Sequence, residues 1–112
     1  MKYAMLIYEK PGYVEALSED EQEAVFAEYT TLRDDRRRVA SAQLQPIATA
    51  TTVRVQDGQT LTTDGPFADT KEVFGGYYVL EADNLDEAIE LAARIPAARL
   101  GGAIEVRPLV EG

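Results

Sequence analysis

Apolar and polar positions along the chain follow strand, helix and turn patterns in a regular order. Met1–Ile7 is a nearly continuous apolar run, typical of a buried strand, and a Lys-Pro-Gly sequence ends it. Ser18 and Glu21 have the spacing of a capping box, which predicts a helix from there to about Val39. In that helix the acidic residues fill the first turn and Arg36–Arg38 the last, as a helix dipole favours.

The second half of the chain predicts further strands, a hairpin and another helix. Two β-rich runs flank Asp57-Gly58, a pair that suits the tight turn of a hairpin because both residues accept positive φ. The predicted elements are, in chain order, a short strand at 42–44, hairpin strands at 51–56 and 59–63, a strand at 74–81, a helix at 84–94 and a strand at 103–109.

Helical spacing predicts which residues face the core. For the first helix these are Val25, Tyr29 and Leu32 with Phe26 beside them. For the second they are Leu85, Ala88, Ile89 and Ala92.

Without the hairpin the order is βαββαβ, so we predict an α+β fold of the ferredoxin-like kind with an inserted β-hairpin, as one domain over residues 1–112. Two helices cover only one face of such a sheet. The 74–81 strand is apolar on both sides, with Tyr77 and Val79 alternating with Tyr78 and Leu80. A strand of this kind is buried on both faces. We therefore expect a homodimer that closes over the free face.

Composition narrows the possible chemistry. The 112 residues include no Cys, no His and no Trp, which excludes disulfides, thiol nucleophiles, imidazole bases and Cys/His metal sites. We expect no metal and no cofactor. A net charge of −9 disfavours nucleic acid and anionic membranes as partners, and no apolar run has the length of a signal or membrane segment, so we expect a cytoplasmic protein. Any chemistry rests on carboxylates, Tyr, Lys and Arg.

The segment Thr63–Glu72, with the sequence TDGPFADTKE, resembles the motif for which the DGPF proteins of the YCII-related family are named. The opening MKYAMLIY, the 44–54 segment, the GGYY segment and the regions around Pro96 and Pro108 resemble the same family, so the likeness covers nearly the whole chain. The resemblance implies a dimeric α+β barrel of ferredoxin-like subunits. It also implies relatives that include a chloro-aromatic dehydrochlorinase, and a genetic context beside extracytoplasmic-function sigma factors.

The resemblance associates catalysis in the wider family with a His on the first helix and an Asp before the Pro that follows the second helix. This chain has no His, and Ile95 precedes Pro96. Both members of that pair are missing, so their chemistry is not carried over.

The DGPF loop supplies the first candidate site residues. Asp64 is a candidate general base or ligand group; alternatively its carboxylate holds the turn by bonding downstream amides. Phe67 is a candidate aromatic wall of a ligand site or a plug that fills it, and Lys71 either clamps a polar ligand or is solvated.

Other candidates lie on the predicted strands. Glu105 and Arg107 share the face of the last strand that the helices leave free. Arg107 is a candidate cation for an anionic substrate and Glu105 a candidate general acid; alternatively they form cross-strand or intersubunit salt bridges. Tyr8 and Tyr77 are candidate ligand contacts or interface aromatics. Gly76, with its neighbour Gly75, marks either a bulge or a close approach of ligand or backbone.

Two functions remain open at this stage. One is a protein that binds a small organic ligand or a partner in a cleft on the sheet face. The other is a cofactor-independent lyase, isomerase or dehydrochlorinase-like enzyme that uses Asp64, Glu105, Arg107 or a Tyr. The first predicts nearly flat stability and affinity from about pH 6 to 8, because no side chain has an unperturbed pKa between about 5 and 8.

Overall fold

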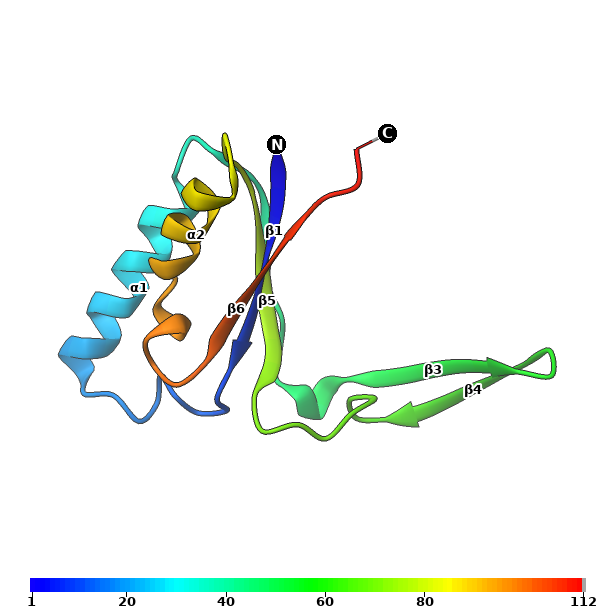
Figure 1. Cartoon of the computed structure of the whole chain (residues 1–112). Coiled ribbons are helices and arrows are strands. Elements are labelled where there is room, and N and C mark those ends of the chain that lie inside the picture. The colour runs from blue at the N-terminus through cyan, green and yellow to red at the C-terminus, as the bar shows by residue number, and fades with distance from the viewer. Residues whose placement is uncertain (112) are drawn as a thin grey trace.

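The main body of the protein is a four-stranded antiparallel sheet in the order β2-β5-β1-β6 (Figure 1). The computed structural model describes residues 1–111, so Gly112, the last residue of the predicted domain, lies outside it. The strands are β1 (Lys2–Glu9), β2 (Arg38–Gln43), β5 (Val73–Glu81) and β6 (Ala103–Pro108). This strand order is that of a ferredoxin-like βαββαβ unit, so the predicted subunit fold is confirmed.

Two helices, α1 (Glu19–Arg33) and α2 (Leu85–Ala93), cover one face of the sheet (Figure 1). Both begin where the sequence predicts, because Ser18 Oγ accepts a hydrogen bond from Glu21 N at 3.2 Å and Asn84 Oδ1 accepts one from Glu87 N at 2.9 Å. A 3-10 turn, η2 (Pro96–Ala98), follows α2. The core between helices and sheet is built on the fully buried side chains Met5, Leu80, Leu91, Ile95 and Pro96.

The first helix is shorter than predicted, since α1 ends at Arg33 rather than near Val39. The cause is Asp35, whose carboxylate accepts hydrogen bonds from the backbone N–H of Arg37 at 2.8 Å and from its guanidinium. An Asp bonded to the amide two residues on favours a turn over a helix. The same contacts lower the pKa of Asp35 to about 2. Because the helix ends early, β2 begins at Arg38, four residues before the predicted strand.

The predicted inner face of α1 is confirmed at Val25, Tyr29 and Leu32, whereas Phe26 beside it and part of the predicted stripe of α2 are exposed. Phe26 is 57% exposed, and Leu85 and Ile89 on α2 are about half exposed. The buried stripe of α2 is Ala88, Leu91 and Ala92, and it continues to Ile95. A spacing of three and four residues fixes the width of an apolar stripe but leaves its rotation to the packing against the sheet.

The sheet face opposite the helices is here called the open face. Direct cross-strand pairing places Glu105 beside Leu6 and Tyr77, and Arg107 beside Ala4 and Val79. The predicted direction of Glu105 and Arg107 is therefore confirmed. The open face comprises Ala4, Leu6, Tyr8, Ala40, Ala42, Phe74, Tyr77, Val79, Ala103, Glu105 and Arg107.

The inserted hairpin, β3 (Thr51–Gln56) and β4 (Gln59–Asp64), forms a separate two-stranded sheet, here called the arm. Its turn has positive φ at Asp57 (50°) and Gly58 (76°), so the predicted tight turn is confirmed. The arm leaves the body on the side away from the helices (Figure 1). The radius of gyration of 15.9 Å exceeds the ~13 Å of a compact domain of this length, as a projecting arm requires.

No helix within residues 1–111 has the length and apolar character needed to cross a membrane.

Candidate functional site

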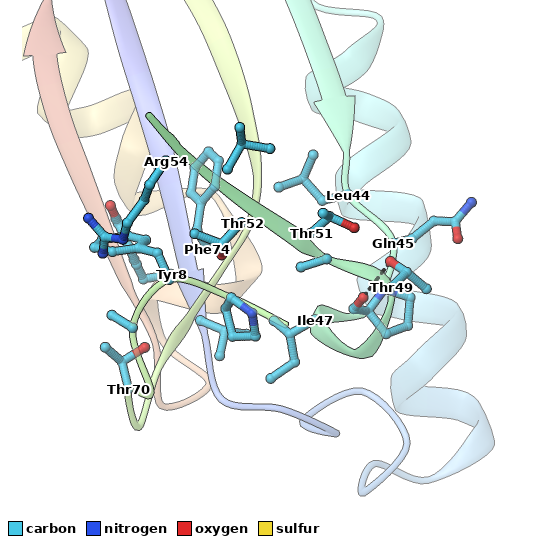
Figure 2. Close-up of a pocket in the computed structure, with 17 residues that line it drawn as sticks. Tyr8, Leu44, Gln45, Ile47, Thr49, Thr51, Thr52, Arg54, Thr70 and Phe74 are labelled. Carbon is cyan, nitrogen blue, oxygen red and sulfur yellow. Dashed lines mark hydrogen bonds between the residues drawn. The ribbon is translucent and has the colours of Figure 1, made fainter. Parts of the chain in front are cut away.

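A cavity of about 870 Å³, here called the arm cavity, lies at the root of the arm (Figure 2). Tyr8 and Phe74 form its wall on the sheet side, with ring centroids 5.6 Å apart. The segment from Leu44 into β3 and the DGPF loop complete it, and Arg54 is the one charged side chain among its lining residues. The arm cavity therefore suits a mostly apolar ligand with a few hydroxyl contacts.

The structure distributes the predicted site residues over several places. Tyr8 and Phe67 line the arm cavity, whereas Gly76 and Tyr77 line a second cavity described below. The carboxylate of Glu105 is ion-paired with Arg107, two residues along the same strand β6, so the pair is neither a cross-strand nor an intersubunit one as the alternative predicts. Asp64 and Lys71 are exposed and line neither cavity.

Asp64 does not hold the DGPF turn, because its carboxylate makes no hydrogen bond within the described residues. The turn is held instead by Gly65 N, which donates to Ala50 O at 2.7 Å, and by Thr52 Oγ1, which donates to Gly65 O at 2.8 Å. Gly65 has φ of 102°, which a side chain would strain. Phe67 is 79% exposed, so it lines the arm cavity without filling it as a plug.

This geometry predicts different losses of stability for two substitutions. Thr52→Val should lower the free energy of unfolding by about 1 kcal/mol, because a part-buried hydrogen bond is lost while strand propensity is kept. Asp64→Ala should change it by less than about 0.5 kcal/mol. Urea denaturation of both variants measures the difference, and a larger loss for Asp64→Ala would restore the turn-holding role of that carboxylate.

The sequence leaves two explanations for Gly75–Gly76, a bulge and a close approach, and the structure shows one at each glycine. Gly75 is the extra residue of a bulge, since Ile7 pairs with Gly76 while Tyr8 pairs with Phe74. At Gly76 a Cβ atom would lie 2.6 Å from the carbonyl oxygen of Ala42, so the backbones of β5 and β2 approach too closely for a side chain.

The second cavity has a volume of about 690 Å³ and is here called the tyrosine groove. It lies between α1, the loop before α1, the C-terminal end of β2 and the N-terminal part of β5. Tyr13 and Tyr29 share a hydrogen bond of 2.8 Å between their hydroxyl groups. The hydroxyl of Tyr78 donates to the backbone carbonyl of Tyr29 at 3.4 Å. Together these residues give the groove an ordered set of phenols.

Glu9 enters the tyrosine groove from the end of β1, and its carboxylate lies over the bare backbone of Gly75. Burial raises the pKa of Glu9 above its ordinary value, and the nearby charge of Glu15 adds to this. Burial likewise raises the pKa of both Tyr13 and Tyr29, with Glu9 as a further contributor to each. The groove thus holds a carboxyl group and two phenols that favour their protonated forms.

Arg33 lines the same groove and supplies a cation there. It takes part in none of the ion pairs found among residues 1–111, and neither does Glu9. The groove therefore has a cation, Arg33, for an anionic group of a ligand and a carboxyl group, Glu9, for proton exchange with it. Within the same residues no three acidic side chains come together as metal ligands.

Sequence reasoning missed Glu9, Tyr13 and Arg33 as members of a site. Tyr29 was predicted on the inner face of the first helix, but as core. One signal could have found it: a buried phenol needs a hydrogen-bond partner, and a second Tyr in the preceding loop offers one. The position before Pro96 contributes nothing to a site, because Ile95 is apolar and fully buried in the core.

A ferredoxin-like sheet with a projecting arm and a groove beside its first helix defines the structural class of this protein. The profile of the YCII-related domain matches residues 1–111, and the chain belongs to this family. A relative, an uncharacterised protein of Rhizobium meliloti (strain 1021), is 36% identical over 97% of this chain and 92% of its own.

A similar solved structure is 5-chloro-2-hydroxyhydroquinone dehydrochlorinase from Burkholderia phenoliruptrix in complex with 2,5-dihydroxybenzoquinone. It has a TM-score of 0.55 and 18% identity, over 100% of this chain and 96% of that one. The likeness shows a shared fold.

Proposed function

We propose that the protein binds a small hydroxylated or acidic organic molecule in the tyrosine groove and exchanges a proton with it through Glu9, without a cofactor. The observation that carries this proposal is the half-buried Glu9 carboxyl group beside the hydrogen-bonded pair Tyr13–Tyr29. The proposal belongs to the class of carboxylate and Tyr chemistry that the sequence allows, but it rests on different residues.

The chemistry follows from the groups in the groove. Ionised Glu9 would accept a proton from an O–H or activated C–H of the ligand, and protonated Glu9 would return it at another atom. A phenol of the pair Tyr13–Tyr29 would donate a hydrogen bond to the oxygen on which negative charge develops. Arg33 would hold an anionic substituent. The raised pKa of Glu9 brings it closer to neutral pH, where a general acid or base is most effective.

The ligand of the similar dehydrochlorinase structure, a dihydroxylated ring compound, falls within this class of molecule. The volume of the groove, about 690 Å³, suits such a molecule, since pockets of about 300–1,000 Å³ hold small organic ligands.

A second candidate function is ligand binding in the arm cavity without chemistry. It corresponds to the cleft on the sheet face that the sequence predicts, and Tyr8 and Phe67 would contact the ligand there. The observation in its favour is that Arg54 is the one charged residue of the lining, so the cavity offers a cation but no base.

The proposed role of Glu9 predicts a specific dependence of stability on pH. The folded state binds the Glu9 proton more tightly than the unfolded state, since burial raises the pKa in the folded state only. Stability should therefore fall as the pH rises from the ordinary Glu value through the raised one. Glu9→Gln should remove this loss and be more stable than the wild type at pH 7, as thermal melts from pH 4 to 8 would measure.

Ligand binding provides the functional half of the test. Titration with 2,5-dihydroxybenzoquinone, followed by NMR, should shift the signals of Tyr13 and Tyr29. Glu9→Gln should remove the part of the pH dependence of its affinity that the Glu9 proton contributes. Glu90→Gln, an exposed change on α2, is the matched control and should leave both measurements unaltered. A Glu9 carboxyl that titrates at the ordinary value, or perturbed signals confined to Tyr8 and Phe67, would refute the proposal, and the second result would favour the arm cavity.

A further inference from the structure

The tyrosine groove and the arm cavity are neighbours that share part of their lining. Residues 44–47, which follow β2, and residues 73–74, which begin β5, line both of them. The backbone N–H of Leu44 donates to the carbonyl oxygen of Gly75 at 2.9 Å, which fixes the first segment beside the second. These two short segments are here called the ridge, because they lie between the groove on the helix side and the cavity at the root of the arm.

The ridge is accessible rather than buried. None of residues 44–47, 73 and 74 is buried, and Leu44 is 43%, Ile47 38% and Phe74 38% exposed. Figure 2 shows Gln45 on the side of α1 and Phe74 on the side of Tyr8, so the ridge spans the distance from one cavity to the other. A ligand that crosses it has no buried side chain to displace.

The end of β1 serves both cavities at once. Tyr8 and Glu9 are consecutive and lie on opposite faces of the sheet, Tyr8 in the arm cavity and Glu9 in the groove. Opposite them Gly75 is the extra residue of the bulge in β5, and a side chain at that position would meet the carboxylate of Glu9. The reactive group of the groove and the aromatic wall of the arm cavity are therefore adjacent.

The two cavities differ in chemistry. The groove contains the carboxyl group of Glu9, the hydroxyl pair Tyr13–Tyr29 and the guanidinium of Arg33. Among residues 1–111, those that line the arm cavity include no carboxylate, and its aromatic and aliphatic side chains are Tyr8, Leu44, Ile47, Val53, Phe67, Val73 and Phe74. A molecule that occupies both cavities would therefore need a polar end and an apolar end.

We propose that the ligand of this protein is amphiphilic. Its hydroxylated or acidic head lies in the tyrosine groove, and an apolar tail crosses the ridge into the arm cavity. This inference rests on the proposed function, since the head is the part that exchanges a proton with Glu9. Burial of the tail beside Tyr8 and Phe74 supplies affinity that the small head lacks, and it holds the head against the carboxyl group.

Two ligands with the same head test the inference. They are 2,5-dihydroxybenzoquinone and its 3-hexyl derivative, titrated into the wild type and followed by NMR. Each methylene group removed from water should tighten binding about fourfold, so a half-buried hexyl tail should lower Kd about 60-fold. Both ligands should shift the signals of Tyr13 and Tyr29, and the hexyl derivative alone should also shift those of Tyr8 and Phe74.

A matched pair of variants locates the tail. Ala68 is half-buried in the lining of the arm cavity, whereas Ala93 is exposed at the end of α2 and lines neither cavity. Ala68→Glu should reduce the gain from the hexyl tail to below about tenfold, because an alkyl chain cannot replace the water that solvates a carboxylate. Ala93→Glu adds the same charge to the protein and should keep the full gain.

The outcomes separate this inference from the proposed function. If Tyr13 and Tyr29 respond but the hexyl tail brings no gain, the inference is wrong and the proposed function stands. Equal gains in Ala68→Glu and Ala93→Glu would also overturn the inference, since the tail would then lie elsewhere. Signals of Tyr13 and Tyr29 that stay unmoved with both ligands would overturn both. Circular dichroism checks the fold of Ala68→Glu, and the comparison of the two ligands on the wild type depends on no variant.

Discussion

Replacement of Gly76 by Ala is expected to lower the free energy of unfolding by about 3 kcal/mol, and the melting midpoint by about 10–20 °C. The new Cβ atom would lie 2.6 Å from the carbonyl oxygen of Ala42, which belongs to the backbone of the neighbouring strand. That strand cannot retreat without losing its pairing with β5. Thermal denaturation measures the loss.

Gly75→Ala is the natural control, because the two glycines are adjacent in the same strand. There the Cβ atom would meet the side chain of Glu9, which can rotate away. We expect a stability loss below about 1 kcal/mol, together with a Glu9 carboxyl group displaced toward solvent that titrates nearer its ordinary value. Equal losses for the two variants would contradict the close approach of strands at Gly76.

Ile95→Asp is expected to destabilise the protein by about 4 kcal/mol or more at pH 7. This change restores the acidic residue that the family resemblance places before Pro96. Ile95 is fully buried, so the new carboxylate would have to ionise among Leu91, Ala97 and their neighbours. The loss should shrink at pH 4, where the carboxyl group is protonated, and denaturation at the two pH values measures it.

The apolar control is Ile95→Val, which removes one methylene group and should cost about 1 kcal/mol at either pH. An Asp variant as stable as the Val variant would mean that the surroundings of residue 95 still accept the acid. The expected result would mean instead that this chain has repacked the position as core.

The order of elements could be predicted from the sequence because local signals start and stop most of them. Ser18, Asn84 and the pair Asp57-Gly58 each act within three residues, and all three are confirmed. The end of α1 could not be predicted in the same way. It depends on a contact between Asp35 and Arg37 that competes with helix formation, and helical periodicity does not register such a contact.

The direction of the arm was beyond sequence reasoning for a different reason. Alternation within residues 51–64 fixes the register of β3 with β4 and nothing else. Whether the hairpin folds back on the body or projects depends on the connections that join it to β2 and β5, which the alternation does not describe. The rotation of α2, which leaves Ile89 exposed, is likewise set by packing rather than by spacing.

The tyrosine groove escaped prediction because its parts are ordinary when taken one at a time. Glu9 marks the polar end of an apolar run, Tyr13 lies in a loop, and Tyr29 fits a core position of α1. Their chemistry arises when the loop before α1 folds back, which brings the hydroxyl groups of Tyr13 and Tyr29 to 2.8 Å. The predicted Asp64, by contrast, stood out through its motif and lies outside both cavities.

The gathering of phenols in the tyrosine groove gives the protein a built-in optical reporter. With no Trp in the sequence, its near-ultraviolet emission comes almost entirely from six tyrosines, and four of them, Tyr13, Tyr29, Tyr77 and Tyr78, line that groove. A molecule that enters it alters the surroundings of most of the fluorophores at once. Occupancy of the groove can thus be followed by unlabelled fluorescence.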